Sequence, residues 1–169
     1  MRLRLILPVL LFLGALVSVA TGQQKASVDD VLLRVSGSGI QDLSLSHEAF
    51  AKLPRTKVDV DVGDGKHQRY EGVSLLKVLE TAGAPTGGKL KGKSVATYVV
   101  AHARDGYQAL FAIAEIDPDF SGSEVLIADT VDGKPLSGEE GKLRLVVPRD
   151  KRHARWVRML ERLEVVTLT

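Results

Sequence analysis

The chain has 169 residues, with 23 lysines and arginines, 21 aspartates and glutamates, four histidines and no cysteine. This length suits one domain with a sizeable hydrophobic core. Without cysteine the chain has no disulfide to stabilise it and no thiolate to offer a metal. A formal net charge of +2 gives no overall case for nucleic-acid binding, which favours a strongly basic face.

The first 22 residues have the features of a secretory signal peptide. A basic start over Met1–Arg4 precedes an apolar run over Leu5–Val17, and small residues surround Ala20. The apolar run is short for a bilayer span, and an uncleaved anchor is the alternative. Removing residues 1–22 takes away two arginines and no acidic residue, so 23 basic and 21 acidic residues become 21 of each. We therefore expect a neutral periplasmic protein whose residues 23–169 form a single domain.

The next segment predicts alternating strands and helices. Strict alternation over Lys57–Val62 places three valines on one sheet face and Asp59 and Asp61 on the wet face. These acids do not form an EF-hand loop, because Gly63 occupies the third ligand position. The expected elements are a strand over Val31–Val35, a short helix capped by Ser46 and stopped by Pro54, a strand over Lys57–Val62, its hairpin partner over His67–Tyr70, and a helix over Ser74–Ala82.

Residues 87–94 read GGKLKGKS and match the G-x-x-x-x-G-K-[ST] pattern of a phosphate-binding P-loop. A P-loop follows a strand and opens a helix, so that backbone N–H groups face the phosphates. Here the string follows the helix over Ser74–Ala82 and leads into a strand over Val95–Ala101, which is the reverse order. We interpret it as a solvated connection.

The second half predicts mainly strands. Trp156, Met159, Leu160 and Leu163 have helical spacing, whereas Leu163–Thr169 reads as a strand, so the C-terminal piece is ambiguous. The chain as a whole predicts an α+β fold with a mixed β-sheet and more strand than helix. Further expected strands cover Tyr107–Phe111 after a turn at Asp105-Gly106, Val125–Ala128 and Leu143–Val147.

Two polar stretches are candidates for a binding site. Ala101–Tyr107 places charge, a ring and a tight turn after a buried strand, and Pro148–Arg158 gathers basic side chains around a tryptophan. If the second stretch were helical, Arg152, Arg155 and Arg158 would lie on one side. Clustered guanidiniums suit a phosphate or carboxylate, and a solvated basic surface balanced by glutamates is the alternative. No metal site is expected, because the histidines lack ligand spacing and cysteine partners.

Five segments, in order, resemble the molybdopterin-binding domain of sulfite oxidase-like oxidoreductases. Gly72–Leu79 resembles that family's GVPLxDLL, and Asp105–Tyr107 resembles its DGY. Val125–Leu136 is similar to LLAYxxxGxPL, while Glu140–Pro148 and Arg155–Val157 are similar to the two parts of HGxPLRLVVPG…GxRxVKWLxxI. The matches cover almost all of the chain after the proposed signal peptide.

The resemblance implies a compact α+β fold with a pterin pocket. In the family, the segment after LVVP contacts the pterin's phosphate, which implies Arg152, His153 and Arg155 here, with Trp156 at an aromatic or aliphatic position. Family oxidoreductases also hold molybdenum through one cysteine thiolate, and this chain has none. A soft metal centre would lack its protein-derived sulfur ligand, so we expect no molybdenum and no required cofactor.

A pterin needs a carboxylate for its 2-amino and N3–H edge, a donor for its 4-oxo group and a flat partner. We assign these roles to Asp105, to Arg104 and to either Tyr107 or Trp156, with nearby arginines taking an anionic tail. No catalytic residue is assigned. The candidate ligand-binding residues are Arg104, Asp105, Tyr107, Arg152, His153, Arg155 and Trp156.

Three functions remain open from the sequence. The first is a periplasmic module that binds a pterin without molybdenum. Small exported, metal-free relatives of similar outline imply that such a module reports to a membrane-bound cyclic-di-GMP enzyme. The second is an oxidoreductase subunit that still carries a molybdopterin cofactor, with the metal held by dithiolenes plus solvent or a side-chain oxygen. The third is a scaffold of the same fold that binds no ligand.

Overall fold

The computed structural model describes residues 30–121 and 124–168. The proposed signal peptide, residues 1–22, lies outside these described residues, as do residues 23–29, 122–123 and 169. Within the described part of the chain, no helix combines the length and the apolar character that a bilayer crossing requires.

The first of two sheets contains the chain's N-terminal and C-terminal strands and is called sheet A. Its strand order is β2-β1-β10-β5-β6, and β1 pairs with β10 in parallel whereas the other neighbours are antiparallel. Val99 and Leu163 are among the inward side chains, and both are fully buried. The strands are β1 (Val31–Gly37), β2 (Leu43–Ser46), β5 (Thr97–Ala103), β6 (Gln108–Ala112) and β10 (Leu160–Thr167).

The second sheet, sheet B, is built on the predicted hairpin. Its order is β3-β4-β7-β8, and β9 also pairs with β7. Gly72 allows β4 to lie close to β7, since a Cβ there would sit 1.9 Å from the Ile127 carbonyl oxygen. The strands are β3 (Arg55–Asp61), β4 (His67–Ser74), β7 (Leu126–Val131), β8 (Lys134–Pro135) and β9 (Arg144–Val146).

Short helices and single turns connect the strands. Ser46 caps the first helix as expected, accepting a hydrogen bond from the Ala49 N–H at 3.2 Å, whereas Ser74 makes no side-chain cap bond. The GGKLKGKS string forms two 3₁₀ turns between α2 and β5, which confirms the order that argued against a P-loop. These elements are α1 (His47–Ala51), α2 (Leu75–Thr81), α3 (Ile113–Ile116), and the 3₁₀ turns η2 (Gly87–Lys89), η3 (Gly92–Ala96), η4 (Gly138–Glu140) and η5 (His153–Arg155).

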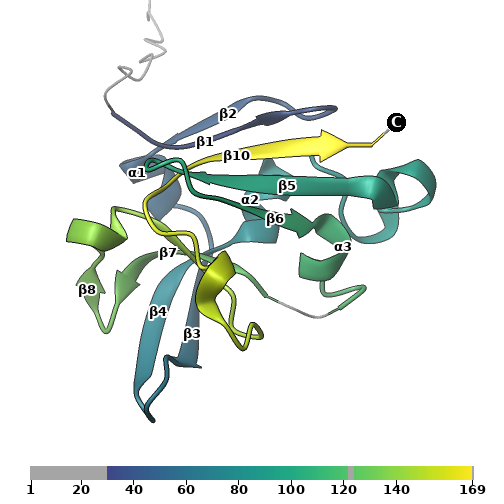
Figure 1. Cartoon of the computed structure of the whole chain (residues 1–169). Coiled ribbons are helices and arrows are strands. Elements are labelled where there is room, and N and C mark those ends of the chain that lie inside the picture. The colour runs from purple at the N-terminus through teal and green to yellow at the C-terminus, as the bar shows by residue number, and fades with distance from the viewer. Residues whose placement is uncertain (1–29, 122–123, 169) are drawn as a thin grey trace, which may run out of the picture.

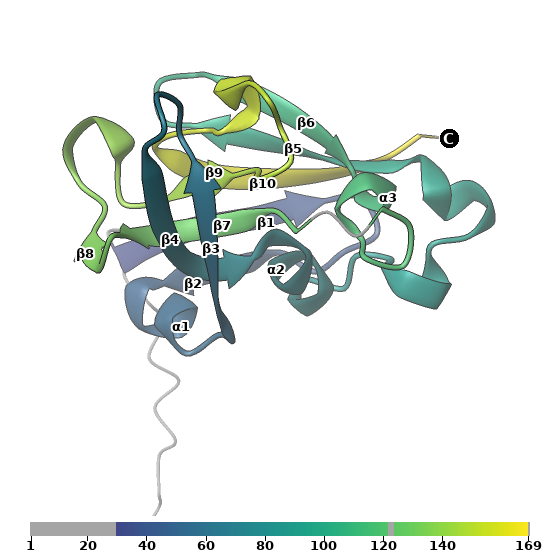
Figure 2. The same cartoon turned by 90° about the horizontal axis from the view of Figure 1, so that it is seen from below.

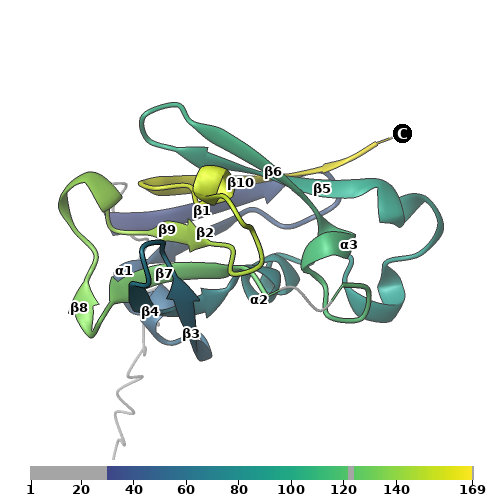
Figure 3. The ribbon, with the colours of Figure 1, turned by 60° about the horizontal axis from the view of Figure 1, so that its bottom comes forward.

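The hydrophobic core lies between the two sheets and α2. Phe50, Phe111 and Leu79 are among the largest fully buried side chains. Figure 1 shows sheet A across the upper part of the molecule with the β3–β4 hairpin hanging below it. Figure 2 shows α1, α2 and the same hairpin in front of sheet A, and Figure 3 shows the two sheets one above the other. The α+β class with more strand than helix is therefore confirmed.

The C-terminal segment resolves the ambiguity in favour of a strand. Only His153–Arg155 form a helical turn, and β10 follows over Leu160–Thr167. Met159 adopts a positive φ of 50°, which no helix would tolerate at that point. The helical alternative that would have grouped Arg152, Arg155 and Arg158 is therefore wrong, and each of the three arginines has different surroundings.

Candidate functional site: the basic loop and two adjoining hollows

Residues 148–158, called here the basic loop, connect β9 to β10. Figure 2 shows its yellow turn η5 near the tip of the β3–β4 hairpin. Several hydrogen bonds tie the loop to its surroundings. Among them, the Trp156 indole N–H donates to the Val147 carbonyl at 3.0 Å, and the Tyr107 hydroxyl donates to the Ala154 carbonyl at 2.6 Å. The two stretches that the sequence singled out are thus in contact.

Arg155 serves the loop as a structural cation. Its guanidinium makes a two-pronged contact with Asp150 at 2.9 and 2.8 Å and donates to Glu115 at 2.9 Å. The same group lies 4.7 Å from the centroid of the Phe111 ring. The hydrogen bonds to Asp150 and the two negative charges raise the pKa of Arg155, and burial opposes this less strongly. Arg155 is therefore engaged within the protein rather than directed at a ligand.

Trp156 is likewise enclosed. It is only 5% exposed, and the imidazole of His153 stacks on it with ring centroids 4.0 Å apart and an interplanar angle of 26°. Tyr70 meets the indole edge-on at 5.9 Å, and the Arg144 guanidinium lies 5.3 Å from its centroid. The indole is thus covered by the protein's own groups, and Tyr107 remains as the accessible ring.

Arg144 is a functional candidate that the sequence reasoning missed. It is 9% exposed, bonds through Nη1 to Glu140 and to the Tyr70 hydroxyl, and packs against the rings of Tyr70 and Trp156. Its Nε–H has no partner within the described residues, which is unusual for a buried donor. A lone arginine inside the apolar string LRLVV was the available signal.

A hollow of about 190 Å³ opens where the two stretches meet. Tyr107 lines this hollow and is 49% exposed. Asp105 uses Oδ1 to accept the Tyr107 backbone N–H at 3.0 Å, and no other described residue bonds to its Oδ2. Arg158 is a further cation, held only loosely by Glu139 at 4.0 Å. The lining residues are Asp105, Tyr107, His153, Ala154, Trp156 and Arg158.

A second, larger hollow of about 480 Å³ lies on the other side of His153. It separates the tip of the β3–β4 hairpin from the start of the basic loop. Arg149 is fixed there by a 2.7 Å bond to the Ser121 carbonyl, whereas Lys151 makes no ion pair with any described residue. The lining residues are Asp61, Val62, Gly63, Pro148, Arg149, Asp150, Lys151 and His153.

The structure brings together four of the seven expected site residues, namely Asp105, Tyr107, His153 and Trp156. Arg104 instead contacts the Met159 sulfur at 3.6 Å and lines a different hollow of about 130 Å³. Arg152 is exposed and makes no side-chain hydrogen bond or ion pair with the described residues. The cation in the smaller hollow is Arg158, which sequence reasoning placed in the basic cluster but not in the site.

The donor set of this region suits an organic heterocycle rather than a soft metal. Carboxylate, imidazole, guanidinium and phenol groups surround the two hollows, and the chain contains no thiolate. Residues 30–121 and 124–168 contain no group of three or more His, Cys, Asp or Glu side chains placed to hold a metal ion. These groups can pair with a polar organic ligand, and molybdenum would lack a sulfur ligand from the protein.

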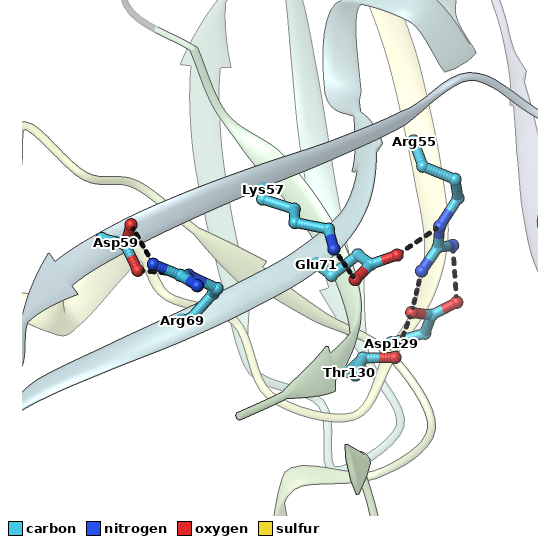
Figure 4. Close-up of polar contacts among 7 residues, drawn as sticks. All are labelled: Arg55, Lys57, Asp59, Arg69, Glu71, Asp129 and Thr130. Atoms are coloured by element: carbon cyan, nitrogen blue, oxygen red, sulfur yellow. Dashed lines mark hydrogen bonds and ion pairs between the residues drawn. The ribbon is translucent and has the colours of Figure 1, made fainter. Parts of the chain in front are cut away.

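A second charged region lies on sheet B and is shown in Figure 4. We call it the ion-pair ladder. Arg55 contacts Asp129 through two nitrogens at 2.8 and 2.6 Å and also approaches Glu71 at 3.6 Å. Lys57 pairs with Glu71 at 3.2 Å, and Arg69 donates two hydrogen bonds to Asp59 at 2.7 and 3.1 Å. Its hollow of about 480 Å³ is lined by four of these paired side chains, Lys57, Asp59, Arg69 and Glu71, together with His67, Gln68, Asp132 and Gly133.

The comparisons with known proteins agree with this architecture. The family model described as the oxidoreductase molybdopterin binding domain matches residues 20–168. A chain of the crystal structure of the sulfane dehydrogenase SoxCD from Paracoccus pantotrophus is similar, with a TM-score of 0.60 and 20% sequence identity. That match covers 79% of this chain and only 37% of the other, so it bears on the fold alone. No curated protein sequence matches the chain significantly.

Proposed function

The chain belongs to the oxidoreductase molybdopterin binding domain family, and on that basis we propose that it binds a pterin beside Tyr107 without ligating molybdenum. One observation carries the proposal: Asp105, Tyr107 and Arg158 line one hollow in a chain that has no cysteine. The family indicates the ligand class, a pterin. The lack of a cysteine ligand is why we propose binding without molybdenum.

Each of the three residues has a defined part in this binding. The carboxylate of Asp105 accepts hydrogen bonds from the amino and N3–H edge of the pterin through Oδ2 and the remaining lone pair of Oδ1. The exposed ring of Tyr107 stacks on the bicycle. Arg158 donates to the 4-oxo group or to an anionic substituent, in the role that the sequence had given to Arg104.

The proposal is tested by titrating the protein with tetrahydrobiopterin in a calorimeter. Tyr107→Ala removes the stacking ring and should weaken binding at least roughly tenfold, since one aromatic stack plus its buried area is at stake. Tyr107→Phe keeps the ring and loses only the hydroxyl bond to Ala154, so it should bind nearly as well as the wild type. Equal affinity in all three proteins, or none in the wild type, would refute the proposal.

The proposal extends to the protein's location and partner. A periplasmic module that senses a pterin would pass its state to the periplasmic domain of a membrane-bound cyclic-di-GMP enzyme. Support comes from the apolar run after a basic start in residues 1–22 and from a sequence without a cysteine thiolate for molybdenum. If such an enzyme co-purifies with this protein only when pterin is added, the result would support this role. Co-purification to the same extent with and without pterin would count against it.

An oxidoreductase subunit that carries a molybdopterin cofactor is the second candidate. The family's description favours it. When bound, that cofactor supplies oxygen-atom or electron transfer at the metal, whereas the residues here only bind and orient it. Elemental analysis separates the two candidates, because this one requires stoichiometric molybdenum.

A further inference from the structure

We propose that His153 is a displaceable cap on Trp156, and that the bicyclic ring of a bound pterin takes the place of its imidazole. The inference rests on the proposed function and adds to it a second stacking partner, Trp156 beside Tyr107, and a selectivity device. It also reconciles an expected role of Trp156 in stacking with the enclosure of that ring in the structure.

The first ground is a contrast in how the residues of turn η5 are held. Ala154 is tied by the Tyr107 hydroxyl, Arg155 by Asp150 and Glu115, and Trp156 by the Val147 carbonyl. The His153 side chain is exposed and makes no hydrogen bond or ion pair with any described residue. Its ring stack on Trp156 is what holds it. A rotation about its side-chain bonds therefore breaks one contact and leaves the turn intact.

The second ground is the size and placement of the two hollows. Sites for drug-sized ligands measure roughly 300–1,000 Å³, and the smaller hollow of about 190 Å³ falls below that range. His153 lines both it and the larger hollow of about 480 Å³. Moving the imidazole away joins them into one slot, floored by Trp156 and flanked by Asp105 and Tyr107 on one side and Lys151 on the other.

The third ground is the chemistry beneath the indole. Arg144 and Tyr70 pack against Trp156 from within the core, and its N–H is bonded to Val147, so the indole is a rigid platform. A small anion such as phosphate gains nothing from that platform and cannot replace the imidazole stack. A flat bicycle overlaps more of the indole than an imidazole does, so it can. The cap therefore selects planar heterocycles and excludes simple anions.

The test compares His153→Ala with His153→Phe in the full-length protein, with tetrahydrobiopterin as the probe in calorimetry. Removing the cap should tighten binding about twofold to tenfold, the factor that corresponds to one aromatic stacking contact. Phenylalanine restores a stacked ring, so its affinity should equal the wild-type value or fall below it. Since Trp156 is the sole tryptophan of the chain, acrylamide quenching of its fluorescence should rise in His153→Ala and not in His153→Phe.

The outcomes separate this inference from the proposed function. Unchanged or weaker pterin binding by His153→Ala would overturn the cap, because a residue that contacts the ligand directly behaves in that way. Unchanged acrylamide quenching in the same variant would overturn it independently of any pterin. If neither the wild type nor His153→Ala binds the probe, the proposed function fails and the ligand-exchange half of this inference fails with it.

Discussion

The ion-pair ladder on sheet B and the basic loop contain the same residue types but use them differently. In the ladder, Arg55 and Arg69 each hold a carboxylate through two nitrogens, and Lys57 shares Glu71 with Arg55. In the basic loop, Arg155 alone is held in this way, whereas Lys151 and Arg152 make no ion pair with the described residues. Figure 4 shows how completely the ladder matches its charges.

This difference teaches where ligand binding can occur on a charged surface. A guanidinium that is already bidentate to a carboxylate must lose that contact before it can bind an anion. A hollow lined by paired charges, such as the one along the ladder, therefore offers little to a ligand despite its size. The hollows beside His153 combine an accessible ring, a carboxylate oxygen, a lysine (Lys151) without an ion pair to the described residues and the loosely held Arg158, which is why we place the site there.

The largest expected effect on stability concerns Arg155, the one arginine of the basic loop that holds a carboxylate through two nitrogens, as the arginines of the ladder do. Arg155→Ala leaves Asp150 and Glu115 without their cation and should lower the free energy of unfolding by about 1–2 kcal/mol, a value discounted because a third of the side chain is exposed. Urea denaturation measures it, with Arg152→Ala as the neutral control. An equal change in both variants would show that Arg155 has no special structural part.

The corresponding change in the ladder should be smaller. Arg55→Ala removes the bond to Asp129 and the weaker contact with Glu71, and we expect a loss of about 1 kcal/mol. Because the ladder is separate from the hollows beside His153, pterin affinity should stay at the wild-type value. A change in affinity with this variant would contradict the separation of the two regions.

A pH effect should come from beneath the loop rather than from the ladder. Burial, only partly offset by the charge of Arg144, raises the pKa of Tyr70 above its ordinary value of 10.0 in the folded state. The contribution of this pKa shift to the free energy of unfolding is fully present below pH 10.0. It is lost as the pH rises through the folded-state pKa, because the Tyr70 hydroxyl of the unfolded chain releases its proton first. Denaturation between pH 9 and 11 should show this decline in the wild type, and Tyr70→Phe should flatten it.

The smallest stability effects, and a clear difference in binding, are expected from two exposed arginines. Arg152→Ala and Arg69→Ala should both leave unfolding almost unchanged, because the first has no partner among the described residues and the second forms an exposed pair. Relative to the wild type, Arg152→Ala should bind neopterin monophosphate more weakly and neopterin equally well. Arg69→Ala should bind both ligands as the wild type does. Equal losses in the two variants would indicate a general field effect instead of a local contact.

The sequence predicted the fold better than the site. Alternation in Lys57–Val62 and the Ser46 cap each depend on local chemistry, and the strand and the helix appear where that chemistry places them. The chain around Trp156 was ambiguous because helical spacing and strand composition overlap there. A tertiary pairing of β10 with both β1 and β5, which no local pattern contains, decides the outcome.

The sequence predicted only part of the site. Its two stretches are recognisable by composition, whereas the hydrogen-bond and ring partners of their side chains come from distant residues. Nothing near Arg155 in the sequence indicates that Glu115 binds it, and nothing near Trp156 shows that Tyr70 and Arg144 enclose it. The same limit explains why Arg158, rather than Arg104, is the cation in the smaller hollow.

The most direct test of the account is the analysis of what the protein carries when it is purified from its native host. Mass spectrometry of the released small molecules and elemental analysis of the same sample would be measured together. We predict a pterin in stoichiometric amount and no molybdenum, since the chain has no thiolate to hold the metal. One molybdenum atom per chain would contradict the central claim, and so would a protein that carries and binds no pterin.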